Sequence, residues 1–392
     1  MKRLGCLVVV FVAALSMAHA RGEIHGTIET SSGETLTGPI HWDQHENFWS
    51  DSLDARKFKP SPRDDGEGFR FSLFGVSIGD LEDGGHAGSQ FSIPFGHLKS
   101  IVRTGSNRAL LVLKSGEEFE ILGGGDIGHG LNDLWIEDVE RGHVELSWRQ
   151  LDRVVFTGGP DEEGRDADRL YGTMKTDDGE FTGFIVWDSD ESFVEEVLDG
   201  DDGKTDREIP FGEIREIERV TRGSRVTLAS GESVTLSGTN DVDSGHRGVV
   251  VVLEGIGTLD VDWRTFKSVK FAKPPAPESF AAFDGGYRLR GTVHTRDGRE
   301  LGGEIVWDLD ETYSWENLDG DVDDLEYSIP FANIRSITPL DDDHCSVVLK
   351  NGRELRLGGS NDVDYDNRGL IVKTPFSLDE IDWSDVARVE FK

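Results

Sequence analysis

The sequence predicts an all-β protein built from repeats, and three observations support this fold class. Val, Ile, Thr, Phe and Trp occur together with 48 Gly, a composition typical of strands joined by tight turns. Short alternating apolar runs are separated by Asp-Gly, Ser-Gly or Asn-Gly pairs, which favour β-hairpins. Beyond the N-terminus, no long segment has the 3.6-residue periodicity of an amphipathic helix.

One block of about 120 residues occurs three times along the chain. The segments IPFGHLKSI, IPFGEIREI and IPFANIRSI begin at 93, 209 and 329, and each follows a Trp-Asp pair. We therefore predict three modules, which are residues 21–156, 170–271 and 287–392, with linkers at 157–169 and 272–286. The first module carries an insertion within about 44–88, where FRFSLFGVSIGD indicates an extra hairpin.

Each module contains a second, shorter periodicity. In the third module Gly298 corresponds to Gly352, and Ile337 corresponds to Val389 about 52 residues later. The second module repeats this relation between Gly179 and Gly231. Each module is therefore predicted to be a pair of half-units. Each half-unit contains a hairpin, a short strand, a break at Pro or Trp, and a final strand.

These residues carry a resemblance to small β-barrels. VVLKNGRELRLGG followed by GLIVK resembles the opening hairpin of Sm-like barrels. SIPFANIRSI resembles the strand, 3₁₀ turn and strand that close SH3-like barrels. The resemblance implies that each half-unit is a small SH3-like barrel. A six-bladed β-propeller is the alternative, because six half-units match six blades. The two linkers argue against it, since they separate modules instead of continuing a ring.

Charge limits the partners that this chain can bind. The Sm-like resemblance would imply RNA binding, but the formal net charge is −35, and such an acidic chain repels phosphate backbones. We therefore expect no nucleic-acid partner. The same charge favours cationic partners and divalent metal ions.

The first 20 residues have the features of a signal peptide. MKR is followed by the apolar run LGCLVVVFVAALSM and by the small residues of Ala18-His19-Ala20. We therefore expect export to the periplasm or the extracellular space, with no membrane span in the mature chain. Cys345 would then be the only thiol of the mature chain, which excludes an intramolecular disulfide, and we expect it in a core.

Acidic loops follow two of the Trp-Asp pairs. Ten carboxylates lie between Asp188 and Glu208, and nine lie between Asp308 and Glu326. Oxygen ligands at flexible spacing suit Ca²⁺, which is the one cofactor that we expect. The EF-hand pattern is not met, because Asp324 replaces the required Gly. The alternative is a solvated acidic loop. The candidate metal ligands are Asp188, Asp190, Asp308, Asp310, Asp319, Asp321 and Asp323.

A second polar motif recurs as GTNDVDSGHRG at 238–248 and as GSNDVDYDNRG at 359–369. One interpretation is a fixed loop, in which Asn and Asp cap the backbone and Arg pairs with Asp. The other is a set that binds a sugar or completes a metal site with a neighbouring Trp-Asp loop. The first module has only GGGDIGHGLND at this place. The candidate residues are Asn240, Asp241, Asp243, Arg247, Asn361, Asp362, Asp364 and Arg368.

The chain has nine tryptophans, and their positions bear on whether the protein binds sugars. Six of them recur, and we expect these in the cores: Trp42, Trp148, Trp187, Trp263, Trp307 and Trp383. Trp49, Trp135 and Trp315 fall outside the pattern, and an exposed ring would stack on a sugar. The sequence contains no GxSxG or HExxH motif and no suggestive Cys-His pair.

We therefore expect a secreted, non-catalytic repeat protein with a binding or scaffolding role in the cell envelope or extracellular space, with Ca²⁺ as a candidate stabilising ion. The expected partner is an envelope or extracellular protein or a glycan. The alternative is a carbohydrate-binding or carbohydrate-active protein.

Overall fold

The computed structural model describes residues 23–43, 46–57, 90–132, 134–159, 169–189, 191–276 and 278–392, together with the backbone of 71–73 and 76–78. Every regular element in these ranges is a β-strand or a short 3₁₀ turn, which confirms the predicted all-β class. No helix that could span a membrane is found in this part of the chain. The predicted signal peptide and most of the insertion lie outside the described residues.

The first predicted module contains twelve strands. They are β1 (His25–Thr30), β2 (Thr35–Trp42), β3 (Ser52–Lys57), β4 (Phe71–Leu73), β5 (Val76–Ile78), β6 (Gln90–Pro94), β7 (Leu98–Gly105), β8 (Arg108–Leu113), β9 (Glu118–Leu122), β10 (Leu134–Asp138), β11 (Gly142–Glu145) and β12 (Leu151–Phe156). β4 pairs with β5 in antiparallel fashion, which is the extra hairpin expected in the insertion.

The second and third predicted modules contain ten strands each. The second has β13 (Tyr171–Lys175), β14 (Glu180–Trp187), β15 (Val197–Asp201), β16 (Asp206–Pro210), β17 (Ile214–Val220), β18 (Gly223–Leu228), β19 (Ser233–Leu236), β20 (Val249–Leu253), β21 (Gly257–Val261) and β22 (Ser268–Phe271). The third has β23 (Arg290–Thr295), β24 (Glu300–Val306), β25 (Asn317–Val322), β26 (Leu325–Pro330), β27 (Ile334–Pro339), β28 (His344–Leu349), β29 (Glu354–Gly358), β30 (Leu370–Lys373), β31 (Leu378–Ile381) and β32 (Val386–Phe391).

Seven 3₁₀ turns punctuate these strands. Three of them begin at the Phe of an Ile-Pro-Phe segment, where the sequence predicts a turn. The turns are η1 (Phe95–His97), η2 (Trp148–Gln150), η3 (Phe211–Glu213), η4 (Asn240–Val242), η5 (Phe280–Ala282), η6 (Phe331–Asn333) and η7 (Trp383–Asp385).

Ten of the twelve strands of residues 23–156 form one antiparallel sheet in the order β11-β10-β2-β1-β12-β7-β8-β9-β3-β6, while β4 and β5 form a separate hairpin. The pairings of β23–β32 give the corresponding order, β31-β30-β24-β23-β32-β27-β28-β29-β25-β26. In residues 169–271 the matching pairings join β13 to β22, and the β15–β16 hairpin contacts β19 through the bridge Asp201↔Ser237. The exact module boundaries remain a prediction.

Strands of the two predicted half-units are interleaved in the pairing order. In residues 287–392 the hairpin β23–β24 pairs with β32 and β30, which come from the second half-unit. The hairpin β25–β26 contacts β29 instead. β27 pairs with β32 at the centre of the sheet. The chain must therefore cross between the two halves of the sheet twice, once after β24 and once after β29.

The closed barrels expected from the SH3-like resemblance are not found. β6 and β11 lie at opposite ends of the first sheet, and no pairing joins them among the described strands. The physical reason is the central pairing of final strands, as in β7–β12, which continues each sheet into the other half-unit. A six-bladed propeller is contradicted as well, because β13–β14 and β17–β32 belong to one 18-stranded sheet instead of separate blades.

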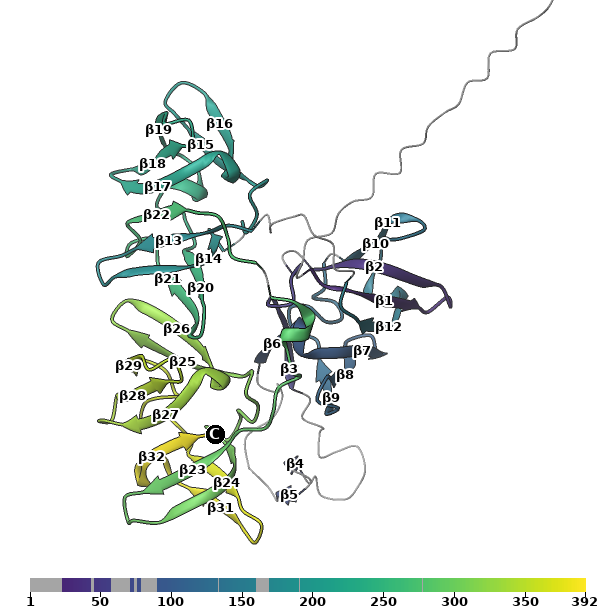
Figure 1. The fold of residues 1–392 in the computed structure, drawn as a ribbon, viewed down its shortest axis with the longest axis vertical. Coiled ribbons are helices and arrows are strands. Elements are labelled where there is room, and N and C mark those ends of the chain that lie inside the picture. The colour runs from purple at the N-terminus through teal and green to yellow at the C-terminus, as the bar shows by residue number, and fades with distance from the viewer. Residues whose placement is uncertain are drawn as a thin grey trace, which may run out of the picture.

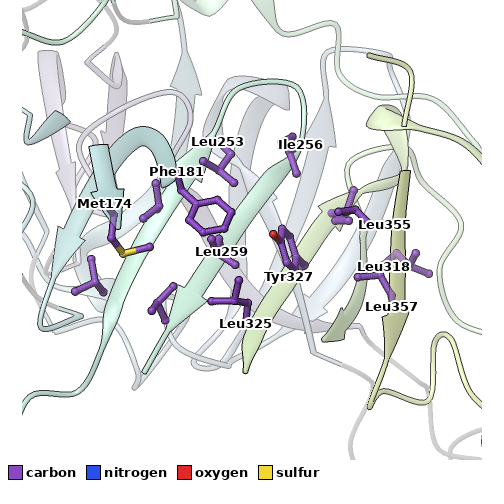
Figure 2. Close-up of a cluster of buried hydrophobic side chains, with 14 of the residues drawn as sticks. Met174, Phe181, Leu253, Ile256, Leu259, Leu318, Leu325, Tyr327, Leu355 and Leu357 are labelled. Carbon is purple, nitrogen blue, oxygen red and sulfur yellow. The ribbon is translucent and has the colours of Figure 1, made fainter. Parts of the chain in front are cut away.

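We call residues 23–156, 169–271 and 287–392 the first, second and third units. The second and third units are docked through a shared core (Figure 2). β21 pairs with β26, and Leu259 opposes Tyr327 in this register. Both side chains are buried. In the turn before β21, Ile256 is 7% exposed, and its carbonyl accepts a hydrogen bond from Asn333 Nδ2 at 3.2 Å. The linker at 272–286 therefore connects units that pack directly on each other.

The first unit lies beside the other two (Figure 1). Its Phe48 stacks on Phe193 of the second unit, with 5.7 Å between ring centroids. Its Phe91 packs against Trp315 of the third unit, also at 5.7 Å. Arg169 makes an ion pair of 3.2 Å with Asp51. These contacts hold the first unit against both of the others.

Most tryptophans have structural positions. Of the six recurrent ones, five are buried and Trp383 is partly buried. Trp49 and Trp315 are buried too, so neither offers a ring face to a sugar. Trp135 stacks on His41, with 4.7 Å between centroids. Cys345 is fully buried, as the sequence predicts, and its Sγ donates to the carbonyl of Val363 at 3.1 Å.

Two glycine variants test the docking of the second and third units. Gly257 has a φ of +148°, and a Cβ there would lie 2.2 Å from the carbonyl oxygen of Ser328 in the third unit. Gly352 has a φ of +90° but nothing within 4 Å of such a Cβ. We expect Gly352→Ala to lower the free energy of unfolding in urea by about 1–2 kcal/mol through backbone strain. Gly257→Ala should lower it by roughly twice as much, because a steric clash is added. Equal losses would contradict the docked arrangement.

Candidate functional site

The two recurrent polar motifs meet in space. The Trp-Asp loop follows β24 and the Asn-Asp-Val-Asp loop follows β29, so they are the two crossovers of one sheet. Both crossovers occupy the same place in their half-units, and the interleaving of strands brings them together. The site is thus assembled from segments about 50 residues apart in sequence.

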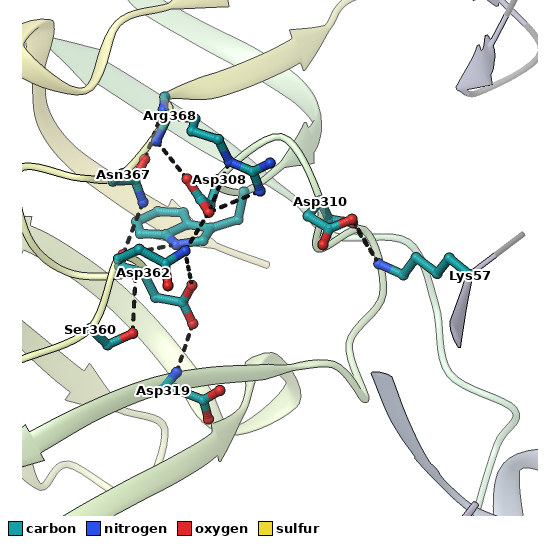
Figure 3. A network of polar contacts seen from close by, with 11 residues as sticks. Lys57, Asp308, Asp310, Asp319, Ser360, Asp362, Asn367 and Arg368 are labelled. Carbon is teal, nitrogen blue, oxygen red and sulfur yellow. Dashed lines mark hydrogen bonds and ion pairs between the residues drawn. The ribbon is translucent and has the colours of Figure 1, made fainter. Parts of the chain in front are cut away.

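In the third unit, Trp307 and Asp362 link the crossovers to the sheet, and Figure 3 shows Asp362 between Asp308 and Asp319. The Trp307 side chain is fully buried, and its Nε1 donates to the backbone carbonyl of Asp362 at 3.1 Å. The carboxylate of Asp362 accepts the backbone N–H of Asp319 in β25 at 2.8 Å. Since a buried indole N–H requires an acceptor, this bond fixes the second crossover over the first.

Asp308 is the buried centre of the contact between the two crossovers. It is 1% exposed and has a φ of 44°. Its carboxylate accepts from Asn361 Nδ2 at 2.7 Å and from the backbone N–H of Arg368 at 2.5 Å. The Arg368 guanidinium adds an ion pair of 3.0 Å. The expected Arg–Asp pair is therefore present, but the Asp belongs to the Trp-Asp loop.

The second unit repeats this arrangement. Asp188 accepts hydrogen bonds from the side chain of Asn240 and from Arg247, whose Nη2 lies 3.1 Å away. Trp187 Nε1 donates to the carbonyl of Asp241 at 2.9 Å. The carboxylate of Asp241 accepts the backbone N–H of Asp199 at 2.8 Å. Asp188, a predicted metal ligand, thus accepts from the same kinds of donor as Asp308.

The first unit retains part of the arrangement despite its divergent sequence. Trp42 Nε1 donates to the carbonyl of Asp126 at 3.1 Å. The Asp126 carboxylate accepts the backbone N–H of Asp54 at 2.6 Å. Asp43 accepts the backbone N–H of Asn132 at 2.8 Å. Asp126 of the GGGD segment therefore takes the structural position that Asp241 and Asp362 have in the other two units. The sequence alone did not reveal this correspondence.

Three carboxylates of the third unit form a candidate cation site. Asp308, Glu311 and Asp362 each place a carboxylate oxygen within 4.8 Å of the others. Glu311 Oε2 is buried and has no hydrogen-bond partner among the described residues. A cavity of about 300 Å³ opens here. Its lining is Gln90, Phe91, Ser92, Asp308, Asp310, Glu311, Glu316, Asn317, Asp319, Asn361, Asp362 and Arg368. A similar set in the first unit is Asp43, Glu46 and Asp126.

The electrostatics of this cavity favour a positive ligand. Burial raises the pKa of Glu311 to about 10, and the charges of Asp362, Asp310 and Glu316 add to the effect. Burial also raises the pKa of Asp362 to about 7, with repulsion from Asp319 and Asp308. Clustered carboxylates in a buried place either take up protons or bind a cation.

Lys57 from the first unit reaches the rim of this cavity. Its ammonium contacts the Glu316 carboxylate and donates to the Asp310 carbonyl at 2.7 Å. Burial opposes the charge on Lys57, but Glu316 and Asp310 outweigh it and raise the lysine pKa. Lys57 therefore compensates the charge of Glu316 and Asp310, while the buried oxygen of Glu311 is left without a donor.

Only some of the predicted metal ligands lie at the cavity. Asp308, Asp310 and Asp319 line the cavity, whereas Asp321 and Asp323 do not. Asp321 lies within β25, and Asp323 lies in the β25–β26 turn with a φ of 54°.

Asp190 lies outside the described residues. Asp243 and Asp364 hold turns, since they accept the backbone N–H groups of Gly238 at 3.0 Å and Asp366 at 2.8 Å.

Glu311 was missed as a ligand by the sequence comparison, although a signal for it exists. Glu46, Glu191 and Glu311 all lie four residues after the recurrent Trp. In each case the backbone N–H of this Glu donates to the carbonyl of that Trp, at 3.2, 2.9 and 3.0 Å. The recurrent spacing therefore reflects a tight turn, and in the first and third units the Glu carboxylate lies within 4.8 Å of two Asp carboxylates.

Comparison of this chain with known protein families, with curated proteins and with solved structures gives no match.

Replacement of the central carboxylate tests whether the two crossovers are held by Asp308. We expect Asp308→Asn to lower the free energy of unfolding by about 2 kcal/mol, because Arg368 and Asn361 lose a charged acceptor. Asp366→Asn is the control, since it makes the same charge change at an exposed turn and should act within about 0.5 kcal/mol. Urea unfolding of both variants is the measurement, and equal stabilities would refute the central role of Asp308.

The raised pKa values predict an unusual pH dependence in EDTA. Folded Asp362 and Glu311 take up protons at a pH at which their unfolded forms are still ionised, so the stability that protonation provides is lost as pH rises through their folded pKa values. We therefore expect the melting temperature to rise as pH falls from 8 to 6. Asp362→Asn should flatten this rise. A wild-type melting temperature that falls over the same interval would contradict the assignment.

Proposed function

We propose that this protein is an exported, non-catalytic binding or scaffolding protein whose third unit is stabilised by a bound divalent cation, best matched by Ca²⁺. One observation carries the cation assignment, which is the buried and unpaired oxygen of Glu311 beside the carboxylates of Asp308 and Asp362. A buried carboxylate oxygen without a donor is costly, and a cation removes that cost.

The chemistry of the cavity selects the class of ion. The side chains that line it offer carboxylate, amide and hydroxyl groups, together with Arg368, and include no His or Cys. Oxygen donors favour Ca²⁺, Mg²⁺ or Mn²⁺ over the softer transition metals. Ca²⁺ suits this site best, because it accepts irregular sets of carboxylate and amide oxygens, whereas Mg²⁺ demands octahedral geometry and retains its waters.

The position of the ion explains a stabilising role. Asp308 and Glu311 belong to the first crossover and Asp362 belongs to the second. An ion held by all three would tie the crossovers together and cancel their mutual repulsion. Gln90 and Ser92 of β6 also line the cavity, so the same ion would strengthen the contact between the first and third units.

The scaffolding role is supported by the extended surface of the molecule. The second and third units form one continuous sheet, and the first unit packs beside them (Figure 1). The alternative is a carbohydrate-binding or carbohydrate-active protein. Of the three tryptophans that favour it, only the half-buried Trp135 stays partly accessible, stacked on His41.

Thermal unfolding of residues 21–392 in EDTA and in millimolar Ca²⁺ tests the cation. We expect Ca²⁺ to raise the melting temperature by several degrees, since binding to the folded state alone adds stability. Glu311→Gln should abolish the Ca²⁺ effect. In EDTA at pH 7 the same variant should melt close to the wild type, because burial raises the pKa of Glu311 to about 10 and the ion-free side chain is already neutral.

Glu300→Gln is the matched control, because Glu300 is exposed in the same unit. It should keep the full response to Ca²⁺. Mg²⁺ serves as the control ion and should act more weakly. Identical melting curves with and without Ca²⁺ in the wild type would refute the cation site, and a response retained by Glu311→Gln would place the ion elsewhere.

A further inference from the structure

The second and third units are joined by the pairing of β21 with β26, two outer strands that occupy different places in their units. β21 is the outer strand at one end of the second unit, and β26 is the outer strand at the opposite end of the third unit. Their counterparts at the far ends of the 18-stranded sheet and its neighbouring hairpin are β31 and β16. Among the described strands, nothing pairs with the outer edge of either one. Figure 1 places β16 and β31 at opposite ends of the column formed by these two units.

A large apolar side chain marks the free β31 end. Phe376 lies two residues before β31, as Ile256 lies two residues before Thr258 in β21. Ile256 is 7% exposed because the third unit covers it, whereas Phe376 is 98% exposed. Phe376 therefore stands, at the free end, where the internal junction buries an apolar residue.

The free edges offer one pair of opposite charges and one pair of like charges, and Arg207 of β16 already makes an ion pair of 2.8 Å with Asp202. When the β21–β26 register is carried over to β31 and β16, Asp379 takes the place of Leu259 and Arg207 takes the place of Tyr327. An apolar pair at the internal junction thus corresponds to a pair of opposite charges. Glu380 would face Asp206, but the internal junction already accepts such a pair in Asp260 and Glu326.

We propose that this protein associates head to tail with a second copy of itself, with β31 of one molecule pairing with β16 of the next. The proposal deepens the scaffolding role and rests on it, but it does not depend on the bound cation. Since β31 and β16 are different surfaces, a pair of copies still has one unpaired β16 edge and one unpaired β31 edge, to which further copies can add. The contact is therefore heterologous and extends into a linear assembly.

Site-directed cross-linking tests this register. Two variants of residues 21–392, Asp379→Cys and Arg207→Cys, are mixed and oxidised at an ionic strength that screens the net negative charge. We expect a disulfide-linked dimer that contains one copy of each variant, in excess over the dimers that each variant forms alone. Cys345 does not compete, because it is fully buried.

Sedimentation velocity of the unmodified chain gives an independent measurement. We expect the mean mass to rise with protein concentration and the rise to be lost in Phe376→Asp. It should persist in Tyr365→Asp, a control at another exposed aromatic residue. Asp379→Lys should weaken association, and adding Arg207→Glu should restore it.

Two results would overturn the proposal. One is a monomer at every concentration, with cross-linking no greater in the mixture than in each variant alone. The other is association that is unaffected by Phe376→Asp. Both can occur while the Ca²⁺ response of the melting temperature is intact, so failure of head-to-tail association and failure of the cation site are distinguishable.

Discussion

The structure depends on the contact between two crossing loops. Because strands of the two predicted half-units are interleaved, the chain passes from one half of the sheet to the other twice, and the two crossovers are held together by a buried carboxylate. In the third unit this is Asp308, which accepts hydrogen bonds from Asn361 and from the backbone of Arg368. The indole of Trp307 adds a bond to the second loop. Without these bonds, a buried charge and several backbone groups would lack partners.

The same contact explains why acidic residues are concentrated after the recurrent Trp-Asp pairs. The loops that cross between halves need polar groups to hold each other, and two of them meet in a partly buried place. Three carboxylates then come within 4.8 Å of one another. Asp308 and Asp362 have structural roles, because their carboxylates accept hydrogen bonds from backbone and side-chain donors of the two crossovers and of β25. These roles do not account for the unpaired oxygen of Glu311, and this residue is what makes the cluster a candidate site.

Local structure was predictable from the sequence, whereas the partners of each strand were not. Asn-Gly and Asp-Gly turns specify which strands are adjacent in a hairpin, and β23–β24 and β28–β29 form as expected. No local signal says that β24 pairs with β30 instead of its own half-unit. The closed barrel was therefore wrong, although the 3₁₀ turn at Phe331 was right. Likewise, spacing identified Asp308 and Asp319, and the turn after Trp307 brings Glu311 close, but only the interleaved topology brings Asp362 beside them.

A crystal structure of the protein grown in Ca²⁺ tests the central claim most directly. We expect an anomalous difference peak between Asp308, Glu311 and Asp362, with carboxylate oxygens at about 2.3–2.6 Å from the ion. The peak should be missing in Glu311→Gln crystals grown in the same solution. A wild-type site without a peak, in which water or a protein group pairs with Glu311 Oε2, would contradict it.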